Sequence, residues 1–140
     1  MQCSRNRAAT LGLLLAIGLL SCRPSTLREP DVIPVPPRLT ESQVKEAIGL
    51  AIAQPPRPGQ TARWYVESEE SGVIIAGYQQ QGYYLQTAIR YDNREIRVEI
   101  RRSKNLLQYR KRIHKAVYVW IFELDLKIRV ELGKFAIQSE

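Results

Sequence analysis

Few of the side chains that commonly carry catalysis or bind metals occur in this sequence. The chain of 140 residues has one histidine, His114, and two cysteines, Cys3 and Cys22. A histidine-based metal cluster cannot be assembled from one histidine, and a Cys–His catalytic pair is not expected. The sequence also has no glycine-rich phosphate loop. We therefore expect a protein that is not an enzyme and that holds no metal or cofactor.

Carboxylates offer one remaining route to catalysis. Glu67, Glu69 and Glu70 lie close together in the sequence and could form the pair that acid–base catalysis needs. They fall on a predicted strand end and turn, where we expect them to be exposed. His114 stands at the start of a predicted helix, where a local hydrogen bond explains it; ligand binding or pH sensing is the alternative.

A long hydrophobic run is missing as well. The apolar stretch of residues 8–21 is shorter than the roughly 20 residues that a membrane-spanning helix needs. It follows two positive residues, Arg5 and Arg7, and contains an apolar core, Leu11–Leu20, before the small Ser21. This order predicts a secretion signal over the first twenty-one residues. The alternatives, a signal anchor or a buried core helix, fit the length or the order less well.

The end of this signal resembles the lipobox of bacterial lipoproteins, through Leu19-Leu20-Ser21-Cys22. The resemblance implies that the thiol of Cys22 receives diacylglycerol, that the signal is cut before it, and that the new amino group is acylated, for example with palmitate. Cys3 leaves with the signal, so no internal disulfide is possible and acylation accounts for the remaining thiol. The alternative is an incidental cysteine at an ordinary cleavage site.

The predicted mature chain is basic. The signal removes two positive charges from a formal net charge of +7, which leaves +5. Arg23, rather than an aspartate, follows Cys22, and the resemblance then implies the periplasmic face of the outer membrane more than the inner membrane. Export separates the protein from nucleic acid, which is therefore not an expected partner. The partners expected for a basic envelope protein are anionic lipid, acidic cell-wall polymer or an acidic protein.

Residues 22–39 are expected to form the acylated cysteine and a proline-rich tether. The segment has five prolines between residues 24 and 37 and few large apolar residues. An extended polyproline-like tether of this length would reach on the order of 50 Å. We therefore expect it to hold the folded domain clear of the lipid head groups.

The rest of the chain predicts a two-layer α+β domain over residues 40–135, followed by a tail over 136–140. A helix is expected to begin at Thr40, which with Gln43 has capping-box spacing, and to end before Pro55. Alternating apolar residues over 62–102 predict a four-stranded antiparallel meander. A long helix from about Ile113 to Leu132, closed by Gly133, then completes a helix–meander–helix order.

A dense basic run connects the meander to the last helix. Between residues 101 and 115 there are seven basic residues and no acidic residue. They are Arg101, Arg102, Lys104, Arg110, Lys111, Arg112 and Lys115. A solvated loop is the simplest interpretation, because charge runs usually keep a protein soluble. Beside an anionic membrane, however, such a run should be attracted to the surface, so we expect an anion-binding segment.

The last helix has two apolar sides. One side is expected to cover the sheet. The second consists of Tyr118, Val119, Phe122, Leu126 and Val130. The first helix could cover this second row; otherwise it predicts a partner-protein interface or a homodimer. A different function, carriage of a small apolar ligand, would need a pocket between sheet and helices lined by Tyr78, Tyr91 and Trp120.

With these elements placed, the chain resembles a group of small bacterial envelope lipoproteins. Four motifs carry the resemblance. They are Gly72-Val73-Ile74-Ile75-Ala76, Ser103-Lys104-Asn105-Leu106-Leu107-Gln108-Tyr109, Ile113-His114 and Trp120-Ile121-Phe122-Glu123-Leu124. The match spans residues 44–128 and implies a shared fold without an enzyme activity. The chain departs from the group at Val119 and Phe122, where the group is polar, and in its more basic loop.

Overall fold

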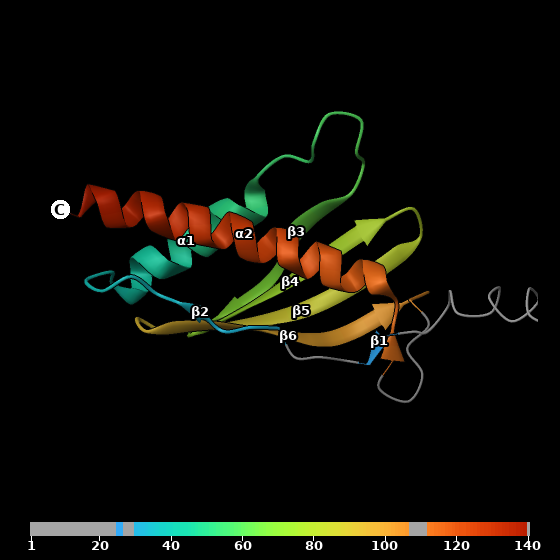
Figure 1. The fold of residues 1–140 in the computed structure, drawn as a ribbon, viewed down its shortest axis with the longest axis horizontal. Helices are drawn as coiled ribbons and strands as arrows, with labels where there is room; N and C mark the ends of the chain where they lie inside the picture. Colours follow the sequence, from blue (N-terminus) through green and yellow to red (C-terminus); the bar gives the residue numbers. More distant parts are fainter. Residues whose placement is uncertain (1–24, 27–29, 107–111, 140) are drawn as a thin grey trace, which may run out of the picture.

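The computed structural model describes residues 25–26, 30–106 and 112–139. Over these residues a five-stranded antiparallel sheet carries two helices on one face (Figure 1). The fold is therefore the two-layer α+β arrangement that the sequence predicts. Its spatial strand order is β2-β6-β5-β4-β3, so consecutive strands of the meander are neighbours.

The four predicted strands form the meander. They are β3 (Arg63–Glu70), β4 (Val73–Gln80), β5 (Tyr83–Tyr91) and β6 (Glu95–Lys104). Gln81 and Gly82, between β4 and β5, both have positive φ, as the tight turn of a two-residue hairpin requires. Asp92, between β5 and β6, accepts hydrogen bonds from the backbone N–H groups of Arg94 and Glu95, at 2.7 and 2.8 Å. These two turns therefore form through their own local chemistry.

The two helices form as the apolar spacing predicts. In α1 (Glu41–Ala53), Thr40 and Gln43 make the predicted capping box, and Val44, Ala47, Ile48 and Ala51 are buried. In α2 (Lys115–Gln138), the buried side contains Val117, Trp120, Ile121, Leu124 and Ile128. These two rows meet the apolar inner face of the sheet, and the core lies between the two layers.

A fifth strand corrects the predicted number of four. β2 (Ile33–Pro34) pairs with the start of β6, and Ile33, Val35 and Leu39 are buried in the core. The expected tether over residues 22–39 therefore packs against the domain in its second half. The prolines suggested an exposed extended chain, but two residues suffice to extend a sheet edge, and Ile33 and Val35, which lie between prolines, point inward. The packed domain begins before the predicted Thr40.

A second, two-stranded sheet joins distant segments. β1 (Ser25–Thr26) pairs antiparallel with β7 (Arg112–Ile113), next to the end of β6 (Figure 1). The residues that follow the expected lipid attachment site thus lie beside the basic run. The alternating-residue pattern could not predict this, because elements of two residues have no measurable periodicity.

The last helix is longer than predicted. α2 does not end at Gly133 but continues to Gln138, with Ser139 as its C-cap. Leu132 is buried and Phe135 packs against the core, and their contacts offset the roughly 1 kcal/mol that a helical glycine costs. Most of the predicted tail over 136–140 therefore belongs to the helix.

Candidate functional site

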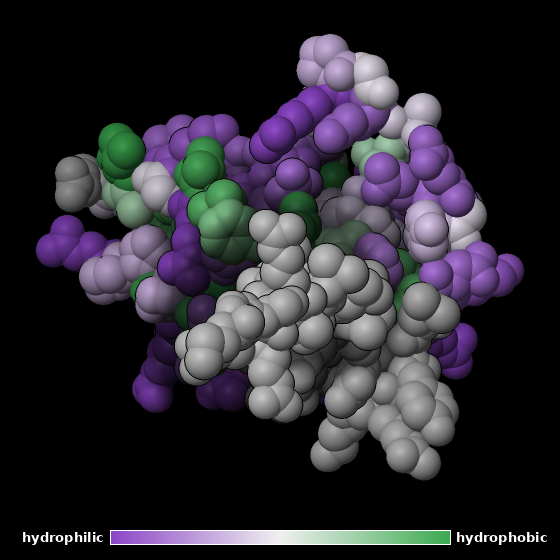
Figure 2. Space-filling model, turned by 45° about the vertical axis from the view of Figure 1, so that its right-hand side comes forward, coloured by the Kyte–Doolittle hydropathy of each residue, from purple (hydrophilic) through white to green (hydrophobic). Residues whose placement is uncertain are grey.

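The second apolar side of α2 lies on the surface. Phe122 is 60% exposed, Val130 56%, Val119 55% and Leu126 46%, whereas Tyr118 is half-buried against the core. α1 packs on another side of α2 and leaves this row uncovered. Figure 2 shows hydrophobic surface between hydrophilic side chains on the face that carries α2. The structure thus brings four of the five predicted interface residues together as one exposed row.

The sequence missed the end of this row. Ile137 is 76% exposed and stands two helical turns beyond Val130, in the part of α2 that follows Gly133. The 3.6-residue spacing from Val130 could have found it, had the helix not been ended at the glycine. The apolar row therefore runs along most of the length of α2.

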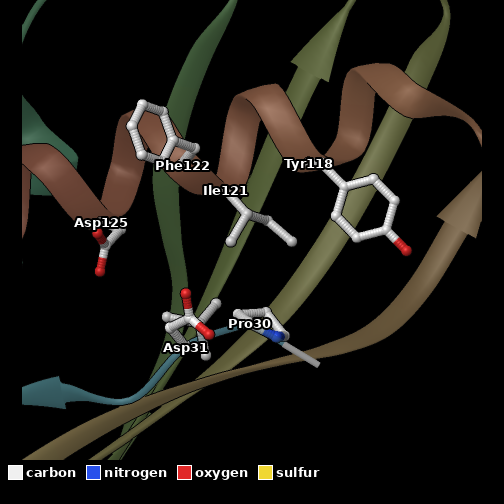
Figure 3. Close-up of a pocket in the computed structure, with 7 residues that line it drawn as sticks. Pro30, Asp31, Tyr118, Ile121, Phe122 and Asp125 are labelled. Carbon is white, nitrogen blue, oxygen red and sulfur yellow. The ribbon is translucent and has the colours of Figure 1, made fainter. Parts of the chain in front are cut away.

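A hollow of about 190 Å³ borders the row. Its walls come from the N-terminal segment, β6 and α2. They are formed by Pro30, Asp31, Val98, Tyr118, Ile121, Phe122 and Asp125. In Figure 3 the carboxylates of Asp31 and Asp125 and the ring of Tyr118 lie around the space between α2 and the N-terminal segment. Carboxylates and aromatic rings beside an apolar floor favour a cationic group over an anionic one.

The described part of the basic run lies at one end of the domain. Arg101, Arg102 and Lys104 are exposed residues of β6, and exposed Lys115 begins α2. The backbone N–H of His114 donates to the carbonyl of Leu106 at 3.1 Å, which ties the start of α2 to the end of β6. These four cations therefore share the end of the domain where β1 and β7 pair.

Among the described residues, none of these four cations has a carboxylate within ion-pair distance. Arg110 and Lys111 lie outside the described residues, and so does Cys22. Arg112 forms part of β7, and its backbone position alone is described. Over the described residues, the exposed side chains of these four cations therefore give this end of the domain a positive charge that no ion pair neutralises.

On the outer face of the sheet, a carboxylate cluster has a structural role. A bulge between Val66 and Ser68 leaves Glu67 as an extra residue of β3. Glu67 accepts hydrogen bonds from the Tyr84 hydroxyl, at 2.7 Å, and from the Gln86 amide. Glu69 instead pairs with Lys45 of α1, at 2.7 Å. Glu67 and Glu69 thus have separate partners on opposite faces of the sheet and do not form a carboxylate pair.

This cluster changes the acidity of two tyrosines. Burial, followed by the hydrogen bond and the negative charge of Glu67, raises the pKa of Tyr84 to about 12. Burial, together with the charge of Glu67, also raises the pKa of Tyr65. No pattern in the sequence predicts this network, because its members come from two strands and the bulge sets their alignment.

His114 caps the last helix. Its Nδ1 accepts a hydrogen bond from the backbone N–H of Ala116, at 3.2 Å, as the N-cap of α2. This contact satisfies one of the N–H groups that a helix start leaves without a partner. The local hydrogen bond expected for His114 is therefore present.

The three residues expected to line a ligand pocket line different hollows. Tyr78 borders a hollow beside Pro55, Trp120 one beside His114, and Tyr91 one beside Lys45. The rings of Tyr78 and Trp120 lie 4.5 Å apart and contact each other. Over the described residues, these three side chains therefore do not line one common hollow.

The described residues have no candidate metal site and no candidate membrane-spanning helix. They contain no group of three histidine, cysteine or acidic side chains placed to bind a metal. They also contain no helix that is long and apolar enough to cross a membrane. Comparisons with protein-family models, curated proteins and solved structures give no match. The resemblance to envelope lipoproteins therefore stays a prediction.

Proposed function

We propose that this protein is a lipid-anchored interaction module of the bacterial envelope, held at an anionic membrane surface by the basic end of its domain. The pairing of Ser25–Thr26 with Arg112–Ile113 is the observation that carries the proposal. A chain spans at most about 3.6 Å per residue, so an acylated Cys22 would be within roughly 11 Å of Ser25. The lipid and the basic end would then meet the same membrane.

This arrangement replaces the long stand-off expected from the prolines. The domain is tied back at β1 and again at β2, so little of the segment after Cys22 is left to act as a spacer. A basic residue near an anionic leaflet contributes about 1 kcal/mol, and the effect fades within a Debye length of about 8 Å. Arg101, Arg102, Lys104 and Lys115 can act only at such short range.

Lipid attachment is tested at Cys22. The full-length chain and its Cys22→Ala variant are expressed in a bacterium with labelled palmitate, and the membrane fraction is examined for label and for chain length. We expect label and signal removal in the native chain, and loss of both in the variant. A variant that is processed and labelled like the native protein contradicts the anchor.

Surface binding is tested separately with vesicles of phosphatidylcholine, with and without phosphatidylglycerol. One variant of the full-length chain has Arg101, Arg102, Lys104 and Lys115 replaced by glutamine. The control removes the same charge from exposed residues at the opposite end of the sheet, which are Lys45, Arg90, Arg94 and Arg97. We expect the first variant alone to lose its preference for the anionic vesicles. Equal losses in both variants would leave net charge, and not the basic end, as the cause.

A further inference from the structure

We infer that the exposed face of α2 binds the same face of a second copy of this chain, with the two helices antiparallel and a two-fold axis at Leu126. The exposed row from Val119 to Ile137 spans nineteen residues, or about 27 Å of helix. It lies opposite the core side of α2. A continuous apolar face of this length on a soluble domain marks a place of contact with another molecule.

The charges beside the row identify the occupant. Asp125 and Arg129 lie on one flank of the row, where they pair within the chain at 2.9 Å. Glu123 and Lys127 lie on the other flank. A two-fold axis perpendicular to two antiparallel helices sets each flank against the same flank of the second copy. Each flank carries both signs, so it can be complementary to itself.

The register of the charges agrees with one position of the axis. With the axis at Leu126, Arg129 of the second copy reaches the level of residue 123, which is about 3 Å along the helix from Asp125. Lys127 of the second copy reaches the level of residue 125, with the same offset from Glu123. On each flank this register forms two symmetric opposite-charge pairs, which outnumber the one like-charge contact at the same offset, Asp125 with Asp125 or Lys127 with Lys127 of the second copy.

The hollow beside α2 fits this arrangement. It lies on the flank of Asp125, and its walls carry the carboxylates of Asp31 and Asp125 and the ring of Tyr118, with Phe122 also bordering it. The guanidinium of Arg129 from the second copy arrives at the level of this hollow. A guanidinium is attracted to a carboxylate by charge and hydrogen bonding, and to an aromatic ring by a cation–π contact.

The apolar side chains are also matched in size in this register. Phe122 is opposite Val130, and Val119 is opposite Gly133, where a Cβ atom would have nothing within 4 Å. A parallel pair of helices would instead set Asp125 midway between Glu123 and Lys127 of the second copy, where attraction and repulsion cancel. The antiparallel arrangement is therefore the one that the charges favour.

A membrane surface suits this face less well. A helix that lies on anionic lipid carries mainly basic residues beside its apolar row, whereas here the acidic Glu123 and Asp125 offset Lys127 and Arg129. The dimer is nevertheless compatible with an anchor in each copy. β2 and Asp31 lie on the flank of Asp125, so the two-fold keeps both N-terminal segments on one side of the pair. The two Lys115 residues then lie about 33 Å apart along the helices, and both basic ends reach one membrane when the flank of Asp125 faces it.

Disulfide cross-linking tests the position of the axis. The full-length chain with Cys3 and Cys22 changed to serine serves as background for Leu126→Cys and, as a matched control, Val119→Cys. Helix axes 8–10 Å apart leave about 4–6 Å between facing Cα atoms, which suits a disulfide. The two Val119 positions would be about 21 Å apart along the helices. We expect oxidation to link Leu126→Cys and to leave Val119→Cys monomeric; the reverse result overturns the register.

Charge exchange tests the flanks without new thiols. Arg129→Asp should weaken self-association roughly tenfold, because two symmetric pairs become repulsive. The double variant Asp125→Arg with Arg129→Asp restores opposite charges within and between chains and should recover the native dissociation constant, measured by analytical ultracentrifugation. A double variant as weak as the single one overturns the proposed pairs.

A photo-reactive amino acid at position 126 distinguishes a second copy from other molecules that could bind this face. It replaces Leu126 in the full-length protein and is activated in intact membranes. Cross-linking to a second copy supports the dimer. Cross-linking to lipid or to a different protein, or a native chain that sediments as a monomer, overturns it.

Discussion

The hydroxyl of Tyr84 donates a 2.7 Å hydrogen bond to Glu67, two strands away on the outer face of the sheet. β4 lies between the strands that carry these residues, and its residue at this level is Gly77, paired with Gln86. The absence of a side chain there lets the Glu67 carboxylate lie across the middle strand. The bulge of β3 and a glycine of β4 together make the contact possible.

The first prediction concerns alkaline pH. The pKa of Tyr84 is raised to about 12, above the ordinary 10.0, so the folded protein holds this proton more tightly than the unfolded chain. The resulting stability is fully present below pH 10 and is lost as pH rises toward 12. We expect the free energy of unfolding to fall less steeply over this range in Tyr84→Phe than in the native protein. Equal slopes in urea denaturation would contradict the raised pKa of Tyr84.

The second prediction concerns Gly77. A Cβ atom there would collide with the Glu67 carboxylate and lie 2.6 Å from Cζ of Tyr65. Gly77→Ala must displace both side chains and should cost about 1–3 kcal/mol of unfolding free energy. Gly49→Ala in α1 is the control, because a Cβ there meets nothing within 4 Å and should stabilise the helix by about 0.5–1 kcal/mol. Chemical denaturation of both variants measures the contrast, and a neutral Gly77→Ala would refute the collision.

The third prediction concerns the cap of α2. His114→Ala removes the acceptor of the Ala116 N–H and should cost about 1 kcal/mol. His114→Asn keeps an acceptor at the N-cap and should retain most of the stability. Thermal and urea denaturation of the two variants provide the measurement. If alanine and asparagine are equivalent, the hydrogen bond of His114 is not what stabilises the start of the helix.

The fourth prediction tests where the domain begins. Ile33 is fully buried, whereas its neighbour Val32 is 40% exposed. Ile33→Ala should lower the free energy of unfolding by about 2–5 kcal/mol, because it leaves a cavity under β2. Val32→Ala should change it by less than about 0.5 kcal/mol. Similar small effects for both would mean that the segment before Thr40 contributes little to the core.

The amino-acid pattern was sufficient to predict the four strands of the meander, the two helices and the faces that they bury. Alternation of apolar residues predicted β3 to β6, and 3.6-residue spacing predicted the buried rows of both helices. The capping box of Thr40 was also predicted correctly. These features depend on residues within about a dozen positions of each other, so local periodicity and capping chemistry are sufficient to find them.

The strand pairings and the exposed helix face on which the proposals rest became visible only in the tertiary structure. β1 meets β7 across more than eighty residues, and β2 completes the sheet edge at β6. The sequence left open whether α1 covers the second apolar row of α2, because this depends on how the two helices share one face of the sheet. In the structure α1 packs on another side of α2, and the row from Val119 to Ile137 is exposed. Such contacts form between surfaces that are complete only after folding, so no local pattern specifies them. Local periodicity shows which side of a helix or strand is apolar, but which element covers that side depends on how the folded elements pack.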